Sequence, residues 1–239
     1  MINFDFSGKR AVIFGGSRGI GKGVVEKLTE AGAETIYAAR KPMDIRTKAK
    51  YYQVDLNSES QISDLFNNVD LIGSIDIVVN TAAINYCKTI DQISIEEWNE
   101  VERVNLRAAF LICKEASARM KNQRSGKIVN VSSIAGIHRS IVSGIHYVST
   151  KAGLIGLTKQ LAFELAEYNV NVNAVCPSQT STDMLKESMT DSELKKLADS
   201  IPLKRIATIE EQVYPILFLC SSLSSYITGA VINVNGGQI

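Results

Sequence analysis

The chain has 239 residues, 45% hydrophobic and 21% charged, and its 26 basic and 25 acidic residues leave a formal net charge of +1. This predicts one well-packed domain over 1–239 and, without a basic run or stripe, no nucleic-acid partner. The cysteines are widely spaced, which predicts reduced thiols, no metal site and a cytoplasmic protein. No apolar run could cross a bilayer and the first residues lack a signal-peptide core, so no membrane partner is expected.

The first elements are a strand, a glycine-rich turn and a helix. Residues 10–14 form an apolar strand, and helical apolar spacing runs over 20–28, before a stop at Gly32. A glycine turn in this place lets a pyrophosphate approach the backbone at the helix N-terminus. We expect a dinucleotide here, the alternative being a tight turn without a ligand. The contacting residues would be Gly15, Ser17, Arg18, Gly19, Ile20 and Gly21.

The second predicted strand, 35–39, ends where a dinucleotide-binding fold meets the adenosine ribose. An acidic residue at this point would accept a bond from the 2′-hydroxyl and select NAD. Here the strand is followed by Arg40 and Lys41, and Arg18 lies in the glycine turn. Guanidinium groups favour a phosphomonoester, so the predicted cofactor is NADP(H). The alternative is that Arg40 and Lys41 only begin a solvated loop.

The rest of the chain continues the alternation of strands and helices. Strands are expected at 51–54, 75–79, 127–131, 170–175 and 230–234, and helices at 58–69, 93–121 (interrupted near its start), 146–168 and 209–219. A polar, methionine-bearing segment covers about 178–204. This alternation predicts an α/β fold, a Rossmann-like doubly wound parallel sheet of about seven strands with helices on both faces.

Tyr147 and Lys151 lie one turn apart on one face of the expected 146–168 helix. The Lys151 ammonium would favour the phenolate and lower the pKa of Tyr147 from its usual value of about 10. Such a tyrosine could exchange a proton with a substrate oxygen near neutral pH. The pattern alone is weak, because a tyrosine and a lysine occur at this spacing by chance in many surface helices.

Motifs in a fixed order strengthen that interpretation. Beside the glycine turn and the Y-x-x-x-K motif, these are Asp55, the NTAA run from Asn80, Asn105 in VNL, Ser133 (with Ser132 as a rival), the PSQTSTDM run from Pro177, SYITG and NGG. With this ordered set the chain resembles the short-chain dehydrogenase/reductase (SDR) family over essentially its whole length, close to 3-oxoacyl-carrier-protein reductases and to dicarbonyl and L-xylulose reductases. Phe14, Thr81, Ala83 and Ser178 depart from the family pattern at supporting positions.

The resemblance implies an NADPH-dependent reduction of a ketone to an alcohol, with no metal. Tyr147 would protonate the carbonyl oxygen, and Ser133 would polarise it. Lys151 would lower the pKa of Tyr147 and bind the nicotinamide ribose, and Asn105 would hold a water that links Lys151 to solvent. Further cofactor contacts are expected from Arg40, Asp55, Leu56, Asn80, Ala82, Tyr147, Pro177, Thr180 and Thr182.

The substrate is expected to meet Ser133, Asn85, Ile141 and Gln179. A small carbonyl compound, a sugar or a polyol-type ketone is favoured, because Tyr168 stands where carrier-protein reductases have a second arginine beside Arg124. The alternatives are a 3-oxoacyl-[acyl-carrier-protein] reductase and, from another class, a catalytically silent NADP(H)-binding scaffold or regulator.

The resemblance also implies a homotetramer or dimer, formed through the long helices around 97–121 and 146–168. The histidines, His138 and His146, are expected to line the pocket or the surface, and a catalytic triad is disfavoured because no G-x-S-x-G elbow is present.

Overall fold

The computed structural model describes residues 4–43, 47–71, 73–182, 185 and 189–239, which form one seven-stranded parallel sheet in the order β3-β2-β1-β4-β5-β6-β7. This confirms the predicted α/β fold class. The strands are β1 (Arg10–Phe14), β2 (Glu34–Ala39), β3 (Lys50–Gln53), β4 (Ile77–Asn80), β5 (Gly126–Val131), β6 (Val170–Pro177) and β7 (Val231–Val234). The longer helices are α1 (Gly19–Glu30), α2 (Glu59–Asp70), α3 (Ile95–Glu102), α4 (Ala108–Gln123), α5 (Ile145–Leu165), α7 (Asp191–Ser200) and α8 (Ile209–Cys220).

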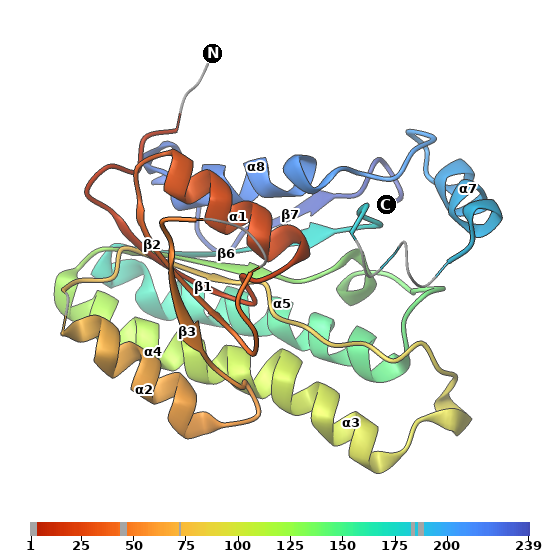
Figure 1. Cartoon of the computed structure of the whole chain (residues 1–239), viewed down its shortest axis with the longest axis horizontal. Coiled ribbons are helices and arrows are strands. Elements are labelled where there is room, and N and C mark those ends of the chain that lie inside the picture. Colours follow the sequence, from red (N-terminus) through yellow and green to blue (C-terminus); the bar gives the residue numbers. More distant parts are fainter. Residues whose placement is uncertain (1–3, 44–46, 72, 183–184, 186–188) are drawn as a thin grey trace.

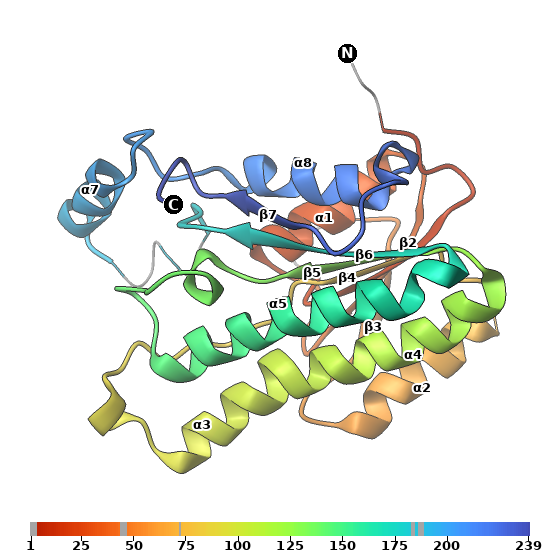
Figure 2. The ribbon, with the colours of Figure 1, turned by 180° about the vertical axis from the view of Figure 1, so that it is seen from behind.

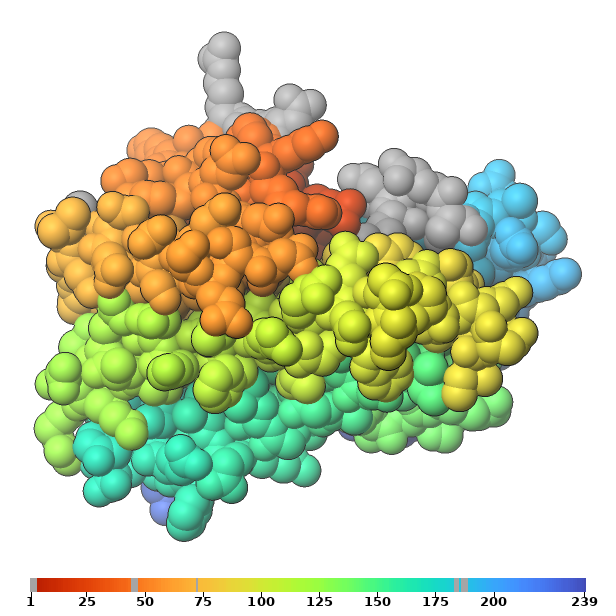
Figure 3. Space-filling view, turned by 90° about the horizontal axis from the view of Figure 1, so that it is seen from below, coloured from red at the N-terminus to blue at the C-terminus, as the bar shows by residue number. Residues whose placement is uncertain are grey.

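Helices cover both faces of the sheet. In Figures 1 and 2, α1 and α8 lie on one face and α2, α4 and α5 on the other. Figure 3 shows α2 (orange), α4 (green) and α5 (teal) side by side from below. Strand β1 serves both layers, because Ala11 and Ile13 join the core under α1 and α8, whereas Val12 and Phe14 join the core over α2 and α4. This alternation with period two packs a central strand against two helical layers.

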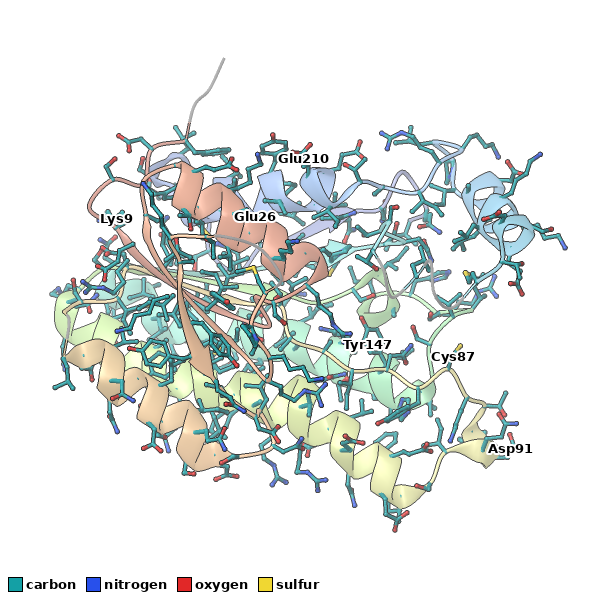
Figure 4. All side chains as sticks on the ribbon, viewed as in Figure 1. Lys9, Glu26, Cys87, Asp91, Tyr147 and Glu210 are labelled. Carbon is teal, nitrogen blue, oxygen red and sulfur yellow. The ribbon has the colours of Figure 1, made fainter. Side chains whose placement is uncertain are left out.

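The order of the strands reverses next to β1, which pairs with β2 on one side and with β4 on the other. In an open parallel sheet this reversal opens a crevice at the carboxyl ends of the strands, where ligands bind. The segments that leave β1, β4, β5 and β6 therefore meet at one edge. Figure 4 shows Tyr147 towards this edge, on the same side as Cys87, with Lys9 towards the opposite end of the sheet.

The expected interruption of the 93–121 helix is a π-helical segment, η2 (Arg103–Arg107), which joins α3 to α4 without a break. A capping box of Ser94 and Glu97 starts α3. A π-helical turn adds one residue to the turn and is frequent at functional sites. Here it carries Asn105, whose side chain is fully buried.

Several predicted boundaries differ from the structure. Strand β4 begins at Ile77 rather than at residue 75, and the last turn of the 146–168 helix is a 3-10 segment, η4 (Ala166–Tyr168). The polar segment contains α7, which the sequence interpretation missed although Thr190 and Glu193 form the capping box that starts it. Part of this segment, including Asp183 and Met184 of the PSQTSTDM run, lies outside the described residues. Within the described chain, none of the helices combines the length and the apolar character that crossing a membrane requires.

Candidate active site

The turn between β1 and α1 forms a backbone cradle. Gly15 and Gly19 have φ angles of +80° and +53°, in the left-handed region that favours glycine. A Cβ on Gly15 would lie 2.8 Å from the Ala82 backbone nitrogen, and one on Gly21 would lie 2.2 Å from the Gly15 carbonyl oxygen. Side chains at these positions would collide with the backbone of the turn and of the loop after β4. Glycine is therefore needed for the turn to pack this closely against the end of β4.

The N-terminus of α1 lies in this cradle and has no side chain to cap it. Its N-cap residue, Arg18, is extended and makes no capping hydrogen bond, and the first turn contains no acidic residue. The first N–H groups of a helix lack partners within the helix and carry partial positive charge. They fit the pyrophosphate of a dinucleotide, as the glycine spacing predicts.

Two arginines flank this cradle on the side of β2. Arg18 and Arg40 are exposed, and neither forms an ion pair with a carboxylate of the described residues. Asp55, expected beside the adenine, accepts hydrogen bonds at Oδ1 from the backbone nitrogen and Nδ2 of Asn57, at 3.0 and 3.2 Å. Its carboxylate thus stabilises the turn after β3. Leu56 is half-buried beside it.

The end of strand β4 lies beside the glycine turn. Asn80 is buried and its Oδ1 accepts from the Ala82 backbone nitrogen at 3.3 Å. Thr81, one of the departures from the family pattern, donates its hydroxyl to the Phe14 carbonyl at 2.8 Å, which ties the end of β4 to the end of β1. This hydroxyl therefore supports the glycine turn, and the departure is compatible with the cradle.

Ser133, Tyr147 and Lys151 come together beyond β5. Ser133 follows the strand and its hydroxyl accepts from the Ala135 backbone nitrogen at 3.1 Å, at the start of η3 (Ile134–Gly136). Lys151 is 1% exposed, its Nζ donates to the Val131 carbonyl at 2.8 Å, and it lies 5.6 Å from the Tyr147 ring centroid. The hydroxyl of the rival Ser132 instead donates to the Lys151 carbonyl at 2.8 Å, so that it holds α5 against β5.

The electrostatics of Tyr147 and Lys151 correct the sequence-based expectation. Burial raises the pKa of Tyr147, and a hydrogen bond with the Ser133 side chain acts in the opposite direction. Burial also lowers the pKa of Lys151 to about 8, because an ammonium without water is destabilised. The pKa of Tyr147 is therefore shifted in the direction opposite to the expectation, and the Lys151 ammonium donates to the Val131 carbonyl. The hydrogen bond from Ser133 is the described interaction that favours the phenolate.

Asn105 ties the π-helical segment to the loop after β4. Its Oδ1 accepts from the Ile84 backbone nitrogen at 2.8 Å, and its Nδ2 donates to the Ile84 carbonyl at 2.9 Å and to the Thr150 hydroxyl at 3.3 Å. Both amide hydrogens are thus used within the protein. The water relay expected at Asn105 stays a prediction.

The residues expected to meet the substrate lie in two segments. Asn85 donates to the Val142 carbonyl at 3.2 Å and accepts from the Gly144 backbone nitrogen at 3.3 Å, so its amide holds the loop before α5. Ile141 in that loop is 72% exposed. The Gln179 Oε1 is buried and has no hydrogen-bond partner among the described residues. The amide of Asn85 therefore holds the loop and Ile141 is exposed to a ligand, whereas the Oε1 of Gln179 is enclosed by the protein.

The segment after β6 reaches back to the glycine turn. Pro177 ends the strand, and Thr180 is buried and pairs with Ala207 in an isolated bridge. A Cβ on Gly19 would lie 3.3 Å from the Thr182 methyl group. The cradle of α1, the end of β6 and the start of the polar segment thus lie together at the carboxyl edge of the sheet.

Two residues of this region were not recognised from the sequence. Cys176 is fully buried, and burial raises the pKa of its thiol, although the nearby Ser132 hydroxyl and Lys151 ammonium favour the thiolate. His146, expected on the pocket wall or the surface, is 1% exposed, whereas His138 is exposed. In the sequence, only their positions point to these residues: Cys176 precedes Pro177 at the end of a strand, and His146 precedes Tyr147. The described residues contain no cluster of three or more His, Cys, Asp or Glu that could hold a metal.

Comparisons with known proteins found similar sequences and similar folds. The profile of the family described as enoyl-(acyl carrier protein) reductase matches residues 15–238. A 3-oxoacyl-[acyl-carrier-protein] reductase of Aquifex aeolicus is 42% identical over 250 aligned positions, which cover 99% of this chain and 100% of the relative.

Two solved structures are similar in fold. An aldohexose dehydrogenase of Thermoplasma acidophilum in ligand-free form has a TM-score of 0.92 and 27% identity, over 98% of this chain and 94% of that chain. A short-chain dehydrogenase of Leptospira borgpetersenii with bound NAD+ has a TM-score of 0.90 and 29% identity, also over 98% and 94%. The similar proteins therefore differ in the substrates that their names give.

Proposed function

The chain belongs to the short-chain dehydrogenase/reductase family of oxidoreductases, and we propose that it is an NADPH-dependent reductase of 3-oxoacyl thioesters carried on an acyl carrier protein. The observation that carries this proposal is the match to the Aquifex reductase, at 42% identity over that relative's whole length. It reverses the preference for a sugar or polyol ketone drawn from Tyr168. The similarity to an aldohexose dehydrogenase supports reduction of a sugar or polyol ketone as a second candidate function.

In this proposal two half-buried side chains, Tyr147 and Ser133, act on the substrate oxygen. Tyr147 donates its phenolic proton to the substrate oxygen, and Ser133 donates a hydrogen bond that positions the same oxygen. The Tyr147 phenol is protonated at neutral pH, and the hydrogen bond with the Ser133 side chain, which acts against the rise of its pKa on burial, favours release of the proton. Lys151 orients the nicotinamide ribose and returns a proton to Tyr147. NADPH, when bound, supplies the hydride.

The choice of NADPH rests on charge at the ribose rim, which we define as Arg18 and Arg40. Both guanidinium groups are exposed and form no ion pair with the described carboxylates. A 2′-phosphate would give them a partner, whereas a 2′-hydroxyl would leave two cations close together. The glycine turn and the residues around Asn80, Asp55 and Thr180 would hold the rest of the dinucleotide.

A cationic patch on the far ends of α4 and α5 would serve the acidic carrier. Lys121 lies 5.0 Å and Arg124 6.0 Å from the Tyr168 ring centroid, and the Arg124 guanidinium donates to the Glu167 carbonyl at 3.0 Å. Tyr168 thus stands in place of the expected second arginine, but its ring binds the side chains of Lys121 and Arg124 through cation–π contacts. We call these residues, Lys121, Arg124 and Tyr168, the basic patch.

The basic patch is remote from Tyr147 within one chain, because Tyr147 begins α5 and Tyr168 follows its end, roughly 30 Å away at helical rise. In a homotetramer or dimer, antiparallel packing of α5 on a second copy would bring the patch to the partner's Tyr147. Phe110 on α4 and Phe163 on α5 are exposed at 49% and 82%, which suits such a contact. A symmetric oligomer is therefore part of the proposal.

One assay separates the candidates. NADPH oxidation would be followed with a 3-oxoacyl thioester on acyl carrier protein, the same acyl group on coenzyme A, and a panel of aldoses, ketoses and diketones. The proposal predicts the highest kcat/KM with the carrier-bound thioester. A higher value with a sugar would favour the second candidate, and tight NADPH binding without turnover of any compound would indicate a silent scaffold.

A further inference from the structure

Helix α5 carries Tyr147 as its third residue, yet no side chain caps its start. The residue before the helix is Gly144, and the first turn contains no acidic residue. The Tyr147 backbone N–H instead donates to Nδ1 of His146 at 2.8 Å. The imidazole thereby satisfies an N–H group that a capping serine or threonine would otherwise bind.

The imidazole is held in one place. His146 is 1% exposed, and its ring lies beside the Tyr86 ring, with centroids 6.0 Å apart. A Cβ on residue 144 would lie 2.5 Å from His146 Cε1 and 2.6 Å from the Tyr86 carbonyl oxygen, so only glycine leaves room for the ring. The amide of Asn85 accepts from the Gly144 backbone nitrogen, which fixes the loop at the same point.

The hydrogen bond defines the state of the ring. Nδ1 accepts from the Tyr147 N–H only when it is unprotonated, and it can donate to the Gly144 carbonyl only when it is protonated. The contact with Tyr147 therefore assigns the neutral ring, with its proton on Nε2, which has no partner among the described residues. Burial lowers the pKa of His146, while the Gly144 carbonyl and Glu97 act against this and Lys88 acts with it. The other ionisable groups nearby are Tyr86 and Glu100, joined by a 2.7 Å hydrogen bond. Protonation of Nδ1 would turn an N–H towards the Tyr147 N–H and break the contact.

We propose that His146 is a positioning residue, whose neutral imidazole fixes the first turn of α5 and with it the place of the Tyr147 phenol. It acts through the helix backbone and does not touch the substrate. The inference rests on the proposed reductase activity for its kinetic test. The geometry explains why a buried histidine with an unsatisfied Nε2 is present directly before the acid: its other nitrogen orders that residue.

The test compares His146→Asn with His146→Gln. The asparagine Oδ1 can occupy the place of Nδ1 and accept the Tyr147 N–H, whereas the glutamine acceptor lies one methylene further out. His146→Asn should keep kcat within about 3-fold, and His146→Gln should lower it roughly 10- to 100-fold, because a small misplacement of a reacting group has effects of this size. The KM for NADPH should not change. His138→Gln, at the exposed histidine, is the matched control.

The pH profile gives a second readout. In the wild type, kcat for reduction should fall as pH drops through the lowered pKa of His146, because the protonated ring loses its contact with the Tyr147 N–H. His146→Asn should lack this acid limb, since an amide does not titrate there. Equal kcat values for the Asn and Gln variants, or an acid limb that persists in His146→Asn, would overturn the proposal.

A measurement without substrate separates this inference from the proposed function. The ultraviolet titration of Tyr147, taken as the difference between each protein and its Tyr147→Phe counterpart, should match the wild type in His146→Asn and shift in His146→Gln. If the wild type reduces no ketone, the proposed function fails while this titration still decides the role of His146. An unchanged titration in His146→Gln would contradict the positioning role.

Discussion

The polar groups of two regions of the molecule differ in their access to water. One region is the catalytic floor, which we define as Asn105, Ser133, Tyr147 and Lys151, and the other is the ribose rim. In the floor, Asn105 and Lys151 are fully buried, and burial shifts the pKa values of Tyr147 and Lys151. At the rim, Arg18 and Arg40 are exposed. Charges interact strongly where water is excluded and weakly where water and salt screen them. Changes in the floor should therefore have large effects, and changes at the rim small, salt-dependent ones.

The severest test of the floor is Tyr147→Phe, which removes the hydroxyl and keeps the ring. We expect kcat to fall about 10³-fold, because general-acid catalysis contributes about 10²- to 10⁴-fold and no second acid replaces the phenol in the proposed mechanism. The dissociation constant for NADPH, measured by fluorescence, should stay unchanged. A loss of less than about 10-fold would place the acid elsewhere and remove the contrast between floor and rim.

Lys151→Met tests whether burial of the ammonium opposes folding. We expect kcat to fall roughly 10²-fold, because the variant loses the group that orients the ribose and reprotonates Tyr147. The free energy of unfolding at neutral pH should instead rise, because the variant no longer buries an ammonium. The pKa of Lys151 is lowered by burial to about 8 from 10.5, so the folded chain disfavours the charged form by about 3 kcal/mol at neutral pH.

The sign of this effect follows from proton binding. Below pH 8 both the folded and the unfolded chain hold the Lys151 proton, and the buried charge destabilises the fold in full. Between about 8 and 10.5 the folded chain has released the proton and the unfolded chain has not, so stability rises with pH. The free energy of unfolding of the wild type, measured in urea, should therefore rise relative to that of Lys151→Met between about pH 8 and 10.5. A constant difference between the two proteins would show that the ammonium is solvated.

Arg18→Ala and Arg40→Ala probe the rim. Each should lower the ratio of kcat/KM for NADPH over NADH about 10-fold at low salt, because one charge-assisted bond to a 2′-phosphate is lost. The effect should shrink at high salt, as screening of exposed charges requires. Lys48→Ala is the control, since Lys48 is exposed before β3 at the other end of the strands. An NADH preference in the wild type would contradict the assignment of the rim.

The fold was predictable because it depends on patterns that the chain repeats. Apolar runs such as residues 10–14 alternate with amphipathic helices, and that alternation alone leads to a parallel sheet covered on both faces. Boundaries were less predictable, as at β4, where Ile75 is buried like a strand residue but lies outside the ladder. Helix α7 was missed because its polar residues hide a weak apolar face, although its capping box is visible.

The site was predictable as a set of residues and less so as a set of interactions. Motif order brought Ser133, Tyr147 and Lys151 together, and the structure has them in one place. The direction of the Tyr147 pKa was wrong, because spacing on a helix reports neighbours and not the loss of water around them. The partners of Asn85 are backbone groups of a loop, and the partner of His146 is the backbone N–H of Tyr147 in α5; no pairwise motif encodes either contact.

Arg124→Glu is the change from which we expect the smallest effect, and it tests whether substrate recognition belongs with the exposed charges of the rim or with the floor. Arg124 lies at the end of α4 with its guanidinium on the Glu167 carbonyl, far from Tyr147 in the same chain. Charge reversal should lower kcat/KM for the carrier-bound thioester about 3- to 10-fold, mainly through association rate, and leave the coenzyme A thioester unchanged. Lys48→Glu should affect neither. Equal losses with both thioesters would mean that the basic patch supports the fold or the oligomer, and that the acidic carrier docks on other residues.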